Sequence, residues 1–217
     1  MRVLIACEES QAVCKEFRKL GHEAYSCDIQ ECSGGYPEWH IQGDALQVIN
    51  REKWDMIIAF PPCTDLTVAC SGLWKEKWED GRQPAAIKFV DDIWGADCPF
   101  ISIENPVGKL NTGWKPMTQM FHPHNFGDPF KKRTCLWLKG LPNLKHTNEV
   151  EAKYHYTSNS TRGGLLKDGT RKKSSLPIYK AWDSAKERSK TFPGVAKAMA
   201  EQWGEYVELH NQNKELS

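Results

Sequence analysis

The chain has 217 residues, of which 40% are hydrophobic, and its 29 Lys and Arg residues nearly balance its 28 Asp and Glu residues. This size and composition predict one domain, or one domain with a small insert, built on a sizeable core. The sequence contains no run of 18 apolar residues, which argues against a membrane-spanning helix. An apolar strand follows Met1 directly, so we expect no signal peptide and a cytoplasmic protein.

The spacing of apolar residues predicts strands that alternate with helices. In chain order we expect a strand at 2–6, a helix at 10–20, strands at 22–27 and 54–60, with a short helix at 43–49 between them, a helix at 84–94, strands at 99–103 and 134–138, and a closing helix at 195–206. Residues 74–81 are charged and carry tryptophan, as a mobile loop or a helix would, and residues 145–180 lose periodicity. This order predicts a three-layer α/β fold around a largely parallel sheet.

Polar residues stand where several predicted strands end. Ligands of such folds bind beyond the carboxyl ends of the strands, so these residues are the first candidates for a functional site. They are Cys7, Glu8, Glu9, Asp28, Asp44, Cys63, Glu104 and Asn105.

The most informative of these positions is Cys63. The apolar run 56–59 ends shortly before Pro61 and Pro62, which stop the strand and stiffen the turn because proline lacks a ladder donor and has a fixed φ. A thiol on a rigid turn at a strand end is where α/β enzymes place a nucleophile. The alternative is a capped strand with an incidental cysteine. The eight cysteines contain no C-x-x-C pair, so no metal site is predicted.

Three carboxylates at other strand ends suit separate roles. Asp28 closes the second strand, where a carboxylate accepts hydrogen bonds from a ribose, and Asp44 suits an adenine amino group; a turn cap and a helix N-cap are the alternatives. Partial burial of Glu104 would raise its pKa towards a value useful for proton transfer, unless it is a surface carboxylate beside a turn. A Cys-His hydrolase ranks lower, because His122 and His124 lie in a proline-containing loop.

Charge is distributed unevenly along the chain. Residues 1–108 carry 10 Lys and Arg against 18 Asp and Glu, whereas residues 109–190 carry 17 against 6. A basic block of this size predicts a surface that faces a polyanion, and a solvated basic loop is the alternative. We favour the polyanion because aromatic residues interleave with the charges, as in nucleic-acid sites. These aromatic residues are Trp114, Tyr154, Tyr156, Tyr179 and Trp182.

Several segments together resemble the motifs of the DNA cytosine-5 methyltransferases. Residues 61–67 (P-P-C-T-D-L-T) are similar to the nucleophile loop P-P-C-Q-x-x-S, and residues 104–106 (E-N-P) to the motif E-N-V. Residues 126–133 (F-G-D-P-F-K-K-R) and the strand after them resemble Y-G-x-P-Q-x-R-x-R. Residues 20–28 resemble the passage through the second strand, and residues 193–200 the closing helix. The matches come in family order and span most of residues 3–204.

The resemblance implies a Rossmann-like S-adenosylmethionine-dependent methyltransferase fold, with S-adenosyl-L-methionine as cofactor and a flipped-out cytosine, expected in double-stranded DNA, as substrate. Cys63 would attack carbon 6, Glu104 would contact N3, and Arg133 would hold the nucleotide near the thiolate together with Lys132. The implied cofactor-binding residues are Cys7, Glu8, Glu9, Asp28, Asp44 and Pro61. The other implied substrate-binding residues are Asn105, Lys132, Lys167, Arg171, Lys172 and Lys173.

The resemblance also implies a division into a catalytic α/β domain (1–140), a small basic target-recognition region (141–185) and a C-terminal helix that returns to the catalytic domain (186–217). It suggests a bacterial or phage protein, and no obligate protein partner is evident. The family's glycine-rich first loop, F-x-G-x-G-G, corresponds here to residues 7–12 (C-E-E-S-Q-A), which contain no glycine. Two alternatives therefore stay open. One is a cytosine-modifying enzyme that acts on RNA, on a free nucleotide or with an altered cofactor, and the other is an inactive nucleic-acid-binding protein of the same fold.

Overall fold

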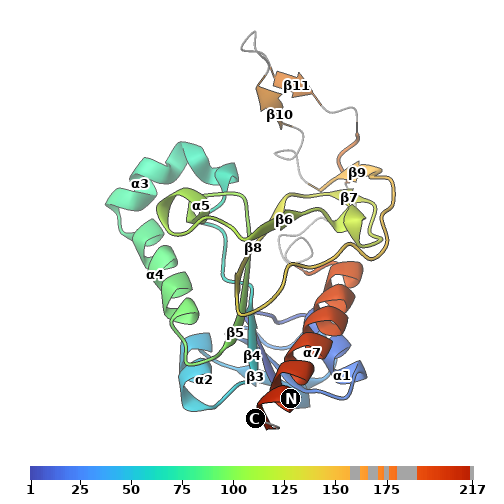
Figure 1. Ribbon diagram of the computed structural model, residues 1–217. Coiled ribbons are helices and arrows are strands. Elements are labelled where there is room, and N and C mark those ends of the chain that lie inside the picture. The colour runs from blue at the N-terminus through green and yellow to red at the C-terminus, as the bar shows by residue number, and fades with distance from the viewer. Residues whose placement is uncertain (157–161, 166–170, 174–175, 180–189, 216–217) are drawn as a thin grey trace.

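The computed structural model describes residues 1–156, 162–165, 171–173, 176–179 and 190–215. Its centre is a seven-stranded sheet of order β3-β2-β1-β4-β5-β8-β6, in which β8 runs antiparallel to both neighbours and the other strands are parallel to one another (Figure 1). The strands of this sheet are β1 (Arg2–Ala6), β2 (Glu23–Asp28), β3 (His40–Gln42), β4 (Met56–Ala59), β5 (Phe100–Pro106), β6 (Gln119–Phe121) and β8 (Thr134–Lys139).

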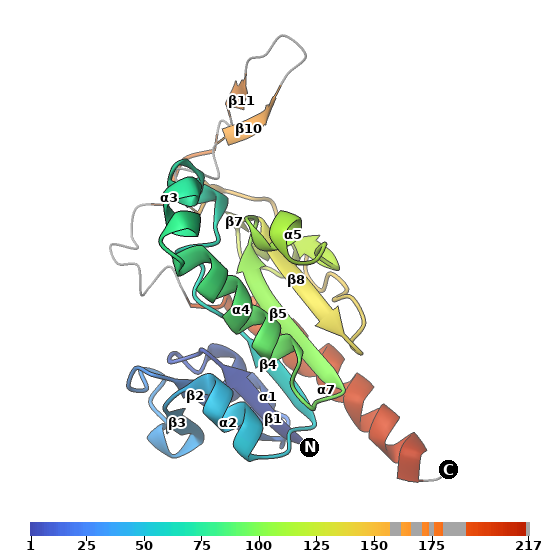
Figure 2. The ribbon, with the colours of Figure 1, turned by 90° about the vertical axis from the view of Figure 1, so that its left-hand side faces the viewer.

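Helices cover both faces of the sheet. The α-helices are α1 (Ala12–Lys19), α2 (Ala45–Arg51), α3 (Trp74–Glu79), α4 (Arg82–Trp94), α5 (Leu110–Gly113) and α7 (Pro193–Glu215), and the 3-10 helices are η1 (Pro37–Trp39), η2 (Val68–Leu73) and η3 (Pro123–Asn125). Figure 2 shows α2 and α4 in front of the sheet, with α7 behind it. Alternate residues of β1 enter the two cores: Val3 and Ile5 pack with α1 and α7, and Leu4 and Ala6 with α2 and α4. The predicted three-layer α/β fold is confirmed.

Several elements differ from the sequence-based expectations. Helix α4 begins at Arg82, so Pro84 is its third residue; proline is tolerated there because N–H groups of the first turn have no intrahelical partner. Strand β5 continues through Glu104 and Asn105 to Pro106, because antiparallel pairing with β8 extends it beyond the apolar run. The short strands β3 and β6 were not predicted.

The carboxyl ends of the parallel strands lie at one end of the molecule, and both chain termini at the other (Figure 1). Two small ribbons lie at the carboxyl end: β7 (Phe130–Lys131) pairs with β9 (Tyr154–His155), and β10 (Arg162–Leu165) pairs with β11 (Arg171–Lys173). Within the part of the chain that the structure describes, none of the helices has the length and apolar character that a membrane crossing requires.

Candidate active site

The Cys63 turn lies at the carboxyl end of β4. The N–H group of Phe60 donates to the Ala6 carbonyl of β1 over 3.0 Å, and the chain then leaves the sheet through the two prolines. The Cys63 carbonyl accepts hydrogen bonds from the N–H groups of Leu66 and Thr67, at 3.0 and 2.9 Å. These bonds close a turn that leaves Cys63 half-buried.

Two side chains from α3 and α4 hold the outer side of this turn. The ammonium group of Lys77, whose side chain is 4% exposed, donates to the Thr64 carbonyl at 2.7 Å and pairs with Asp65 at 2.9 Å. Gln83 donates to the Asp65 carbonyl at 2.9 Å. Sequence reasoning missed both residues, because Lys77 lies in a charged segment that reads as exposed and nothing local marks it as buried.

The inner side of the turn is fixed to β5. The buried Asn105 side chain donates through Nδ2 to the Pro61 carbonyl at 2.9 Å. Just beyond β5, the Lys109 N–H group donates to the Leu66 carbonyl at 2.7 Å. A Cβ atom at Gly108 would lie 2.0 Å from that same carbonyl oxygen, so only glycine permits this approach. The Cys63 turn and β5 therefore form one unit.

Three ionisable groups meet beside this unit: the Cys63 thiol, the Glu104 carboxyl group and the Lys132 ammonium group. The Lys132 ammonium lies 4.0 Å from a Glu104 carboxylate oxygen and 4.9 Å from the centre of the Tyr156 ring. Burial raises the pKa of Glu104, although the charge of Lys132 lowers it. Burial also raises the pKa of the Cys63 thiol; the charge of Glu104 raises it further and that of Lys132 lowers it. At neutral pH the resting site therefore favours a protonated thiol.

The two basic residues assigned to the site lie differently. Lys132 is half-buried and faces Glu104, whereas Arg133 is exposed, as is Lys131 on the other side. Among the described contacts, none joins Arg133 to Glu104 or Cys63. The structure thus brings Pro61, Cys63, Glu104, Asn105 and Lys132 together and leaves Arg133 at the surface.

The first loop, between β1 and α1, has an unusual backbone. Cys7 and Gln11 adopt left-handed conformations, with φ of 59° and 56°, which glycine normally supplies. The buried Glu8 carboxylate turns back onto α1 and accepts hydrogen bonds from the N–H groups of Val13 (2.7 Å) and Cys14 (3.2 Å). Burial raises the pKa of Glu8 to about 7. Glu8 therefore caps the helix that follows the loop.

The second carboxylate of this loop is also directed inward. The buried Glu9 side chain accepts a hydrogen bond from the Ser33 hydroxyl, and its carbonyl accepts one from the Ser33 N–H group at 2.9 Å. A Cβ atom at Gly34 would lie 2.5 Å from Gln11 Cβ, so a glycine of the next loop permits the close approach. Both carboxylates are thus engaged within the protein.

Asp28 and Asp44 lie at the ends of β2 and β3. One oxygen of Asp28 accepts from the Gln30 N–H group at 2.9 Å, and no described hydrogen bond occupies the other. Beside it, Ile29 is 76% exposed. Asp44 accepts from the first N–H groups of α2 and is therefore an N-cap, the alternative left open above. The second oxygen of Asp28 suits a ribose hydroxyl, and the exposed Ile29 side chain suits an adenine ring. Asp28 and Ile29 therefore suit an adenosine-containing cofactor.

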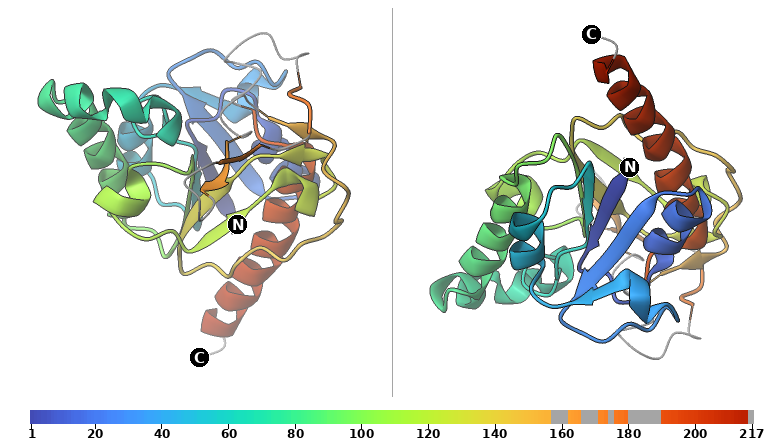
Figure 3. Two further views of the ribbon diagram at one scale, coloured as in Figure 1. Left: turned by 90° about the horizontal axis from the view of Figure 1, so that it is seen from above. Right: turned by 90° about the horizontal axis from the view of Figure 1, so that it is seen from below.

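Three of the basic residues predicted to contact the substrate lie in β11. Arg171, Lys172 and Lys173 form β11, and Lys167 lies outside the described residues. Seen from above, the β10–β11 hairpin crosses the carboxyl end of the sheet (Figure 3). The buried side chains of Leu141, Leu144 and Tyr156, within the region assigned to target recognition, belong to the core that includes α7.

No protein-family model matches the chain, and no curated protein matches it. The Entamoeba histolytica methyltransferase EhMeth is 14% identical over 69% of this chain and 57% of that one, with a TM-score of 0.50. The S. pombe Dnmt2 methyltransferase is 10% identical over 66% and 51%, with a TM-score of 0.45. A candidate DNA modification methyltransferase encoded within an E. coli prophage is 13% identical over 64% and 46%, with a TM-score of 0.43.

The chain spans between 46% and 57% of these three structures. At such identities the likeness concerns the fold alone. The likeness to EhMeth and the position of antiparallel β8 within the sheet identify a Rossmann-like methyltransferase fold, as predicted.

The pKa of Cys63 provides a test of the site's electrostatics. Lys132→Gln removes the cation that lowers this pKa, so alkylation of Cys63 by iodoacetamide should need a higher pH than in the wild-type protein. Glu104→Gln should shift the profile the opposite way. Peptide mass spectrometry measures alkylation at Cys63 separately from the other cysteines.

The matched control is Lys131→Gln, which removes the same charge from the exposed neighbouring position. It should move the alkylation profile less than Lys132→Gln. Equal shifts in the two variants would contradict a specific influence of Lys132.

The buried Glu8 predicts a pH-dependent stability. The folded chain holds this proton more tightly than the unfolded chain, so the stabilisation is complete below about pH 4.5 and is lost as the pH rises to about 7. Across this window the wild-type protein should lose on the order of 1 kcal/mol per pH unit relative to Glu8→Gln. Urea unfolding measures this difference. The free energy of unfolding of Glu31→Gln, changed at an exposed position, should follow the same pH dependence as that of the wild type. If Glu8→Gln also followed the wild-type pH dependence, Glu8 would not be the group that causes it.

Proposed function

We propose that this protein is an S-adenosylmethionine-dependent methyltransferase that methylates carbon 5 of cytosine in DNA through a covalent adduct with Cys63. The observation that carries the proposal is the meeting of Cys63, in the turn after β4, with Glu104, near the end of β5, and Lys132. A nucleophile beside a carboxyl group whose pKa is raised by burial suits addition to an electron-poor ring.

In the proposed reaction, the thiolate of Cys63 adds to carbon 6 of the cytosine while Glu104 donates its proton to N3. Carbon 5 thereby becomes nucleophilic and takes up the methyl group. A base then removes the proton from carbon 5, the bond between sulfur and carbon 6 breaks, and N3 returns its proton. The raised pKa of Glu104 supports its role, because the carboxyl group must be protonated before the addition.

Lys132 contributes in two ways. Its charge lowers the pKa of Cys63 and so increases the thiolate fraction. Its ammonium group also lies over the Tyr156 ring, which holds it beside Glu104. Arg133 is exposed at the surface beside Lys132, and we assign it to a phosphate of the nucleic-acid backbone, which a guanidinium binds well.

S-adenosylmethionine would supply the methyl group as an electrophile. Asp28 would bind its ribose, with Ile29 against the adenine and Asp44 near the adenine amino group. The backbone of residues 7–11 and Pro61 would line the remaining surface. Since Glu8 and Glu9 are engaged within the protein, their carboxylates need not repel the cofactor.

DNA is the proposed substrate because of the charge of the second half of the chain. Residues 109–190 carry 17 Lys and Arg against 6 Asp and Glu, a balance suited to the phosphate backbone. We assign target recognition to residues 141–185, with Arg171, Lys172 and Lys173 on the β10–β11 hairpin. Lys167 completes this assignment.

Covalent trapping tests the nucleophile. A duplex that contains 5-fluorocytosine should form a stable adduct in the presence of S-adenosylmethionine, because fluorine at carbon 5 cannot leave as a cation. Intact-mass spectrometry should detect protein plus DNA plus one methyl group. Cys63→Ser should abolish the adduct and reduce methyl transfer to ordinary DNA on the order of a thousandfold or more.

The matched control is Cys70→Ser, which changes another half-buried cysteine seven residues further along and should keep activity. Methyl transfer that survives in Cys63→Ser would exclude the proposed mechanism. Adducts with RNA or a free nucleotide but not with DNA would favour the alternative substrates. Tight DNA binding without any adduct would favour a binding protein, and calorimetric titration with S-adenosylmethionine tests the cofactor separately.

A further inference from the structure

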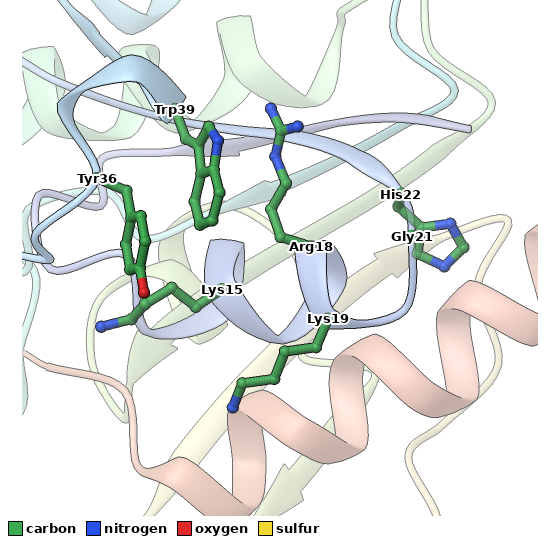
Figure 4. Close-up of a pocket in the computed structure, with 7 residues that line it drawn as sticks. All are labelled: Lys15, Arg18, Lys19, Gly21, His22, Tyr36 and Trp39. Carbon is green, nitrogen blue, oxygen red and sulfur yellow. The ribbon is translucent and has the colours of Figure 1, made fainter.

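A second basic surface lies on α1, outside the candidate active site. Lys15, Arg18 and Lys19 are spaced at i, i+3 and i+4, so they project from one face of the helix. Figure 4 shows Arg18 beside the Trp39 ring and the end of Lys15 near Tyr36, whereas the Lys19 side chain extends towards α7. These residues line a groove with a volume of about 400 Å³. None of these five residues belongs to the set assigned to the cofactor or the cytosine.

The groove lies beside the connection between β2 and β3, which contains no α-helix. Only the 3-10 helix η1 (Pro37–Trp39) lies in this connection, and it borders α1 through Trp39, while α7 packs against α1 on the same face of the sheet. Trp39 packs against the core and, with Tyr36, forms one wall of the groove. Lys15, Arg18 and Lys19 come from α1 on the other side.

Arg18 is held rigidly at this groove. Its Nε donates to the Ala24 carbonyl at 2.6 Å, and its guanidinium carbon lies 4.8 Å from the centre of the Tyr25 ring and 5.1 Å from that of Trp39. No described hydrogen bond or ion pair engages its two terminal nitrogens. A guanidinium fixed in this way presents a fork of donors that matches a phosphate group.

The lysines add positive charge beside this fork. The Lys15 ammonium group donates one hydrogen bond to the Gly34 carbonyl, at 3.3 Å, and has two further donors. Lys19 is exposed and pairs with Glu16 at 2.6 Å. Three cations thus line the groove; Glu16 pairs with Lys19, and Glu208 lies 3.2 Å from His22, which also lines it. In residues 1–108 as a whole, acidic residues outnumber basic ones 18 to 10.

The aromatic wall offers a stacking surface. The rings of Tyr36 and Trp39 are parallel within 7°, with centroids 4.1 Å apart, and Tyr36 remains 41% exposed. Aromatic rings that are held in place bind nucleobases by stacking, with little dependence on base identity. Figure 4 shows Trp39 between Tyr36 and Arg18, so the groove offers a stacking ring at one end and a guanidinium at the other. These groups suit the base and the phosphate of a nucleotide.

We propose that this groove binds a nucleotide, with its phosphate on Arg18 and Lys15, the charge of Lys19 nearby, and its base on Tyr36. The same chemistry is offered by a free nucleotide and by one unit of a nucleic-acid strand. A strand bound here would contact the protein at a second point, apart from the cytosine at Cys63.

Calorimetric titration with two probes tests the groove: thymidine 5′-monophosphate, and a single-stranded oligothymidylate of about twelve nucleotides. Arg18→Gln should weaken binding of at least one probe about tenfold or more, because a charge-assisted pair of hydrogen bonds is lost. Arg51→Gln, which removes the same charge from an exposed site on α2, should bind as the wild type does. If Arg18→Gln binds the monophosphate more weakly, the groove is a free-nucleotide site. If it binds only the oligonucleotide more weakly, the groove is a site for a nucleic-acid strand.

Two further variants separate binding from folding, since Arg18 also packs between two rings. The double variant Lys15→Gln, Lys19→Gln should weaken the same probe with an unchanged melting temperature, and Tyr36→Leu should weaken it while Tyr36→Phe does not. Equal affinities of Arg18→Gln and Arg51→Gln for both probes would overturn the proposal.

The position of the bound nucleotide is tested by crosslinking. Irradiation of a complex with an oligothymidylate that carries 5-bromodeoxyuridine should attach it to the peptide that contains Tyr36. Crosslinks confined to other peptides would overturn a strand site at this groove. Cys63→Ser should leave this binding unchanged, so the result stands or falls independently of the proposed methyl transfer.

Discussion

The candidate site depends on the hydrogen bond from Asn105 to the Pro61 carbonyl. It joins the turn after β4 to β5, and the donor side chain is only 1% exposed. Antiparallel pairing with β8 fixes β5 as far as Pro106, and the close approach of Gly108 to Leu66 fixes the turn from its far side. Cys63 therefore keeps its position relative to Glu104 without a direct bond between their side chains.

Burial raises the pKa of Glu104 and of Cys63, with opposite consequences for their proposed roles. It raises the pKa of Glu104, which suits a group that must carry a proton, and it raises the pKa of Cys63, which must lose one. Lys132 lowers both pKa values, so it favours the thiolate and opposes the protonated carboxyl group. Burial is the larger influence on both groups, so both pKa values stay raised although Lys132 lies 4.0 Å from Glu104.

The sequence predicted the parts of the fold that local patterns determine. Apolar runs identified β1, β2, β4, β5 and β8, and the residues after them identified Cys63 and Glu104. The extension of β5 was not predictable, because it depends on pairing with a distant strand. The choice between Lys132 and Arg133 rests on which of two neighbouring residues turns inward, and the motif contains both. The inward direction of Glu8 also depends on burial, which a polar loop does not reveal.

The loop without glycine connects the candidate site with the groove on α1. Left-handed backbone at Cys7 and Gln11 costs roughly 1–2 kcal/mol for each residue, so other contacts must hold it. Glu8 supplies two bonds to α1, and the Gln11 side chain both donates to the Tyr36 carbonyl (2.8 Å) and accepts from the Tyr36 N–H group (3.1 Å). Tyr36 also forms the wall of the groove on α1. The conformation of the proposed cofactor loop and the position of the stacking ring are therefore maintained by the same side chain.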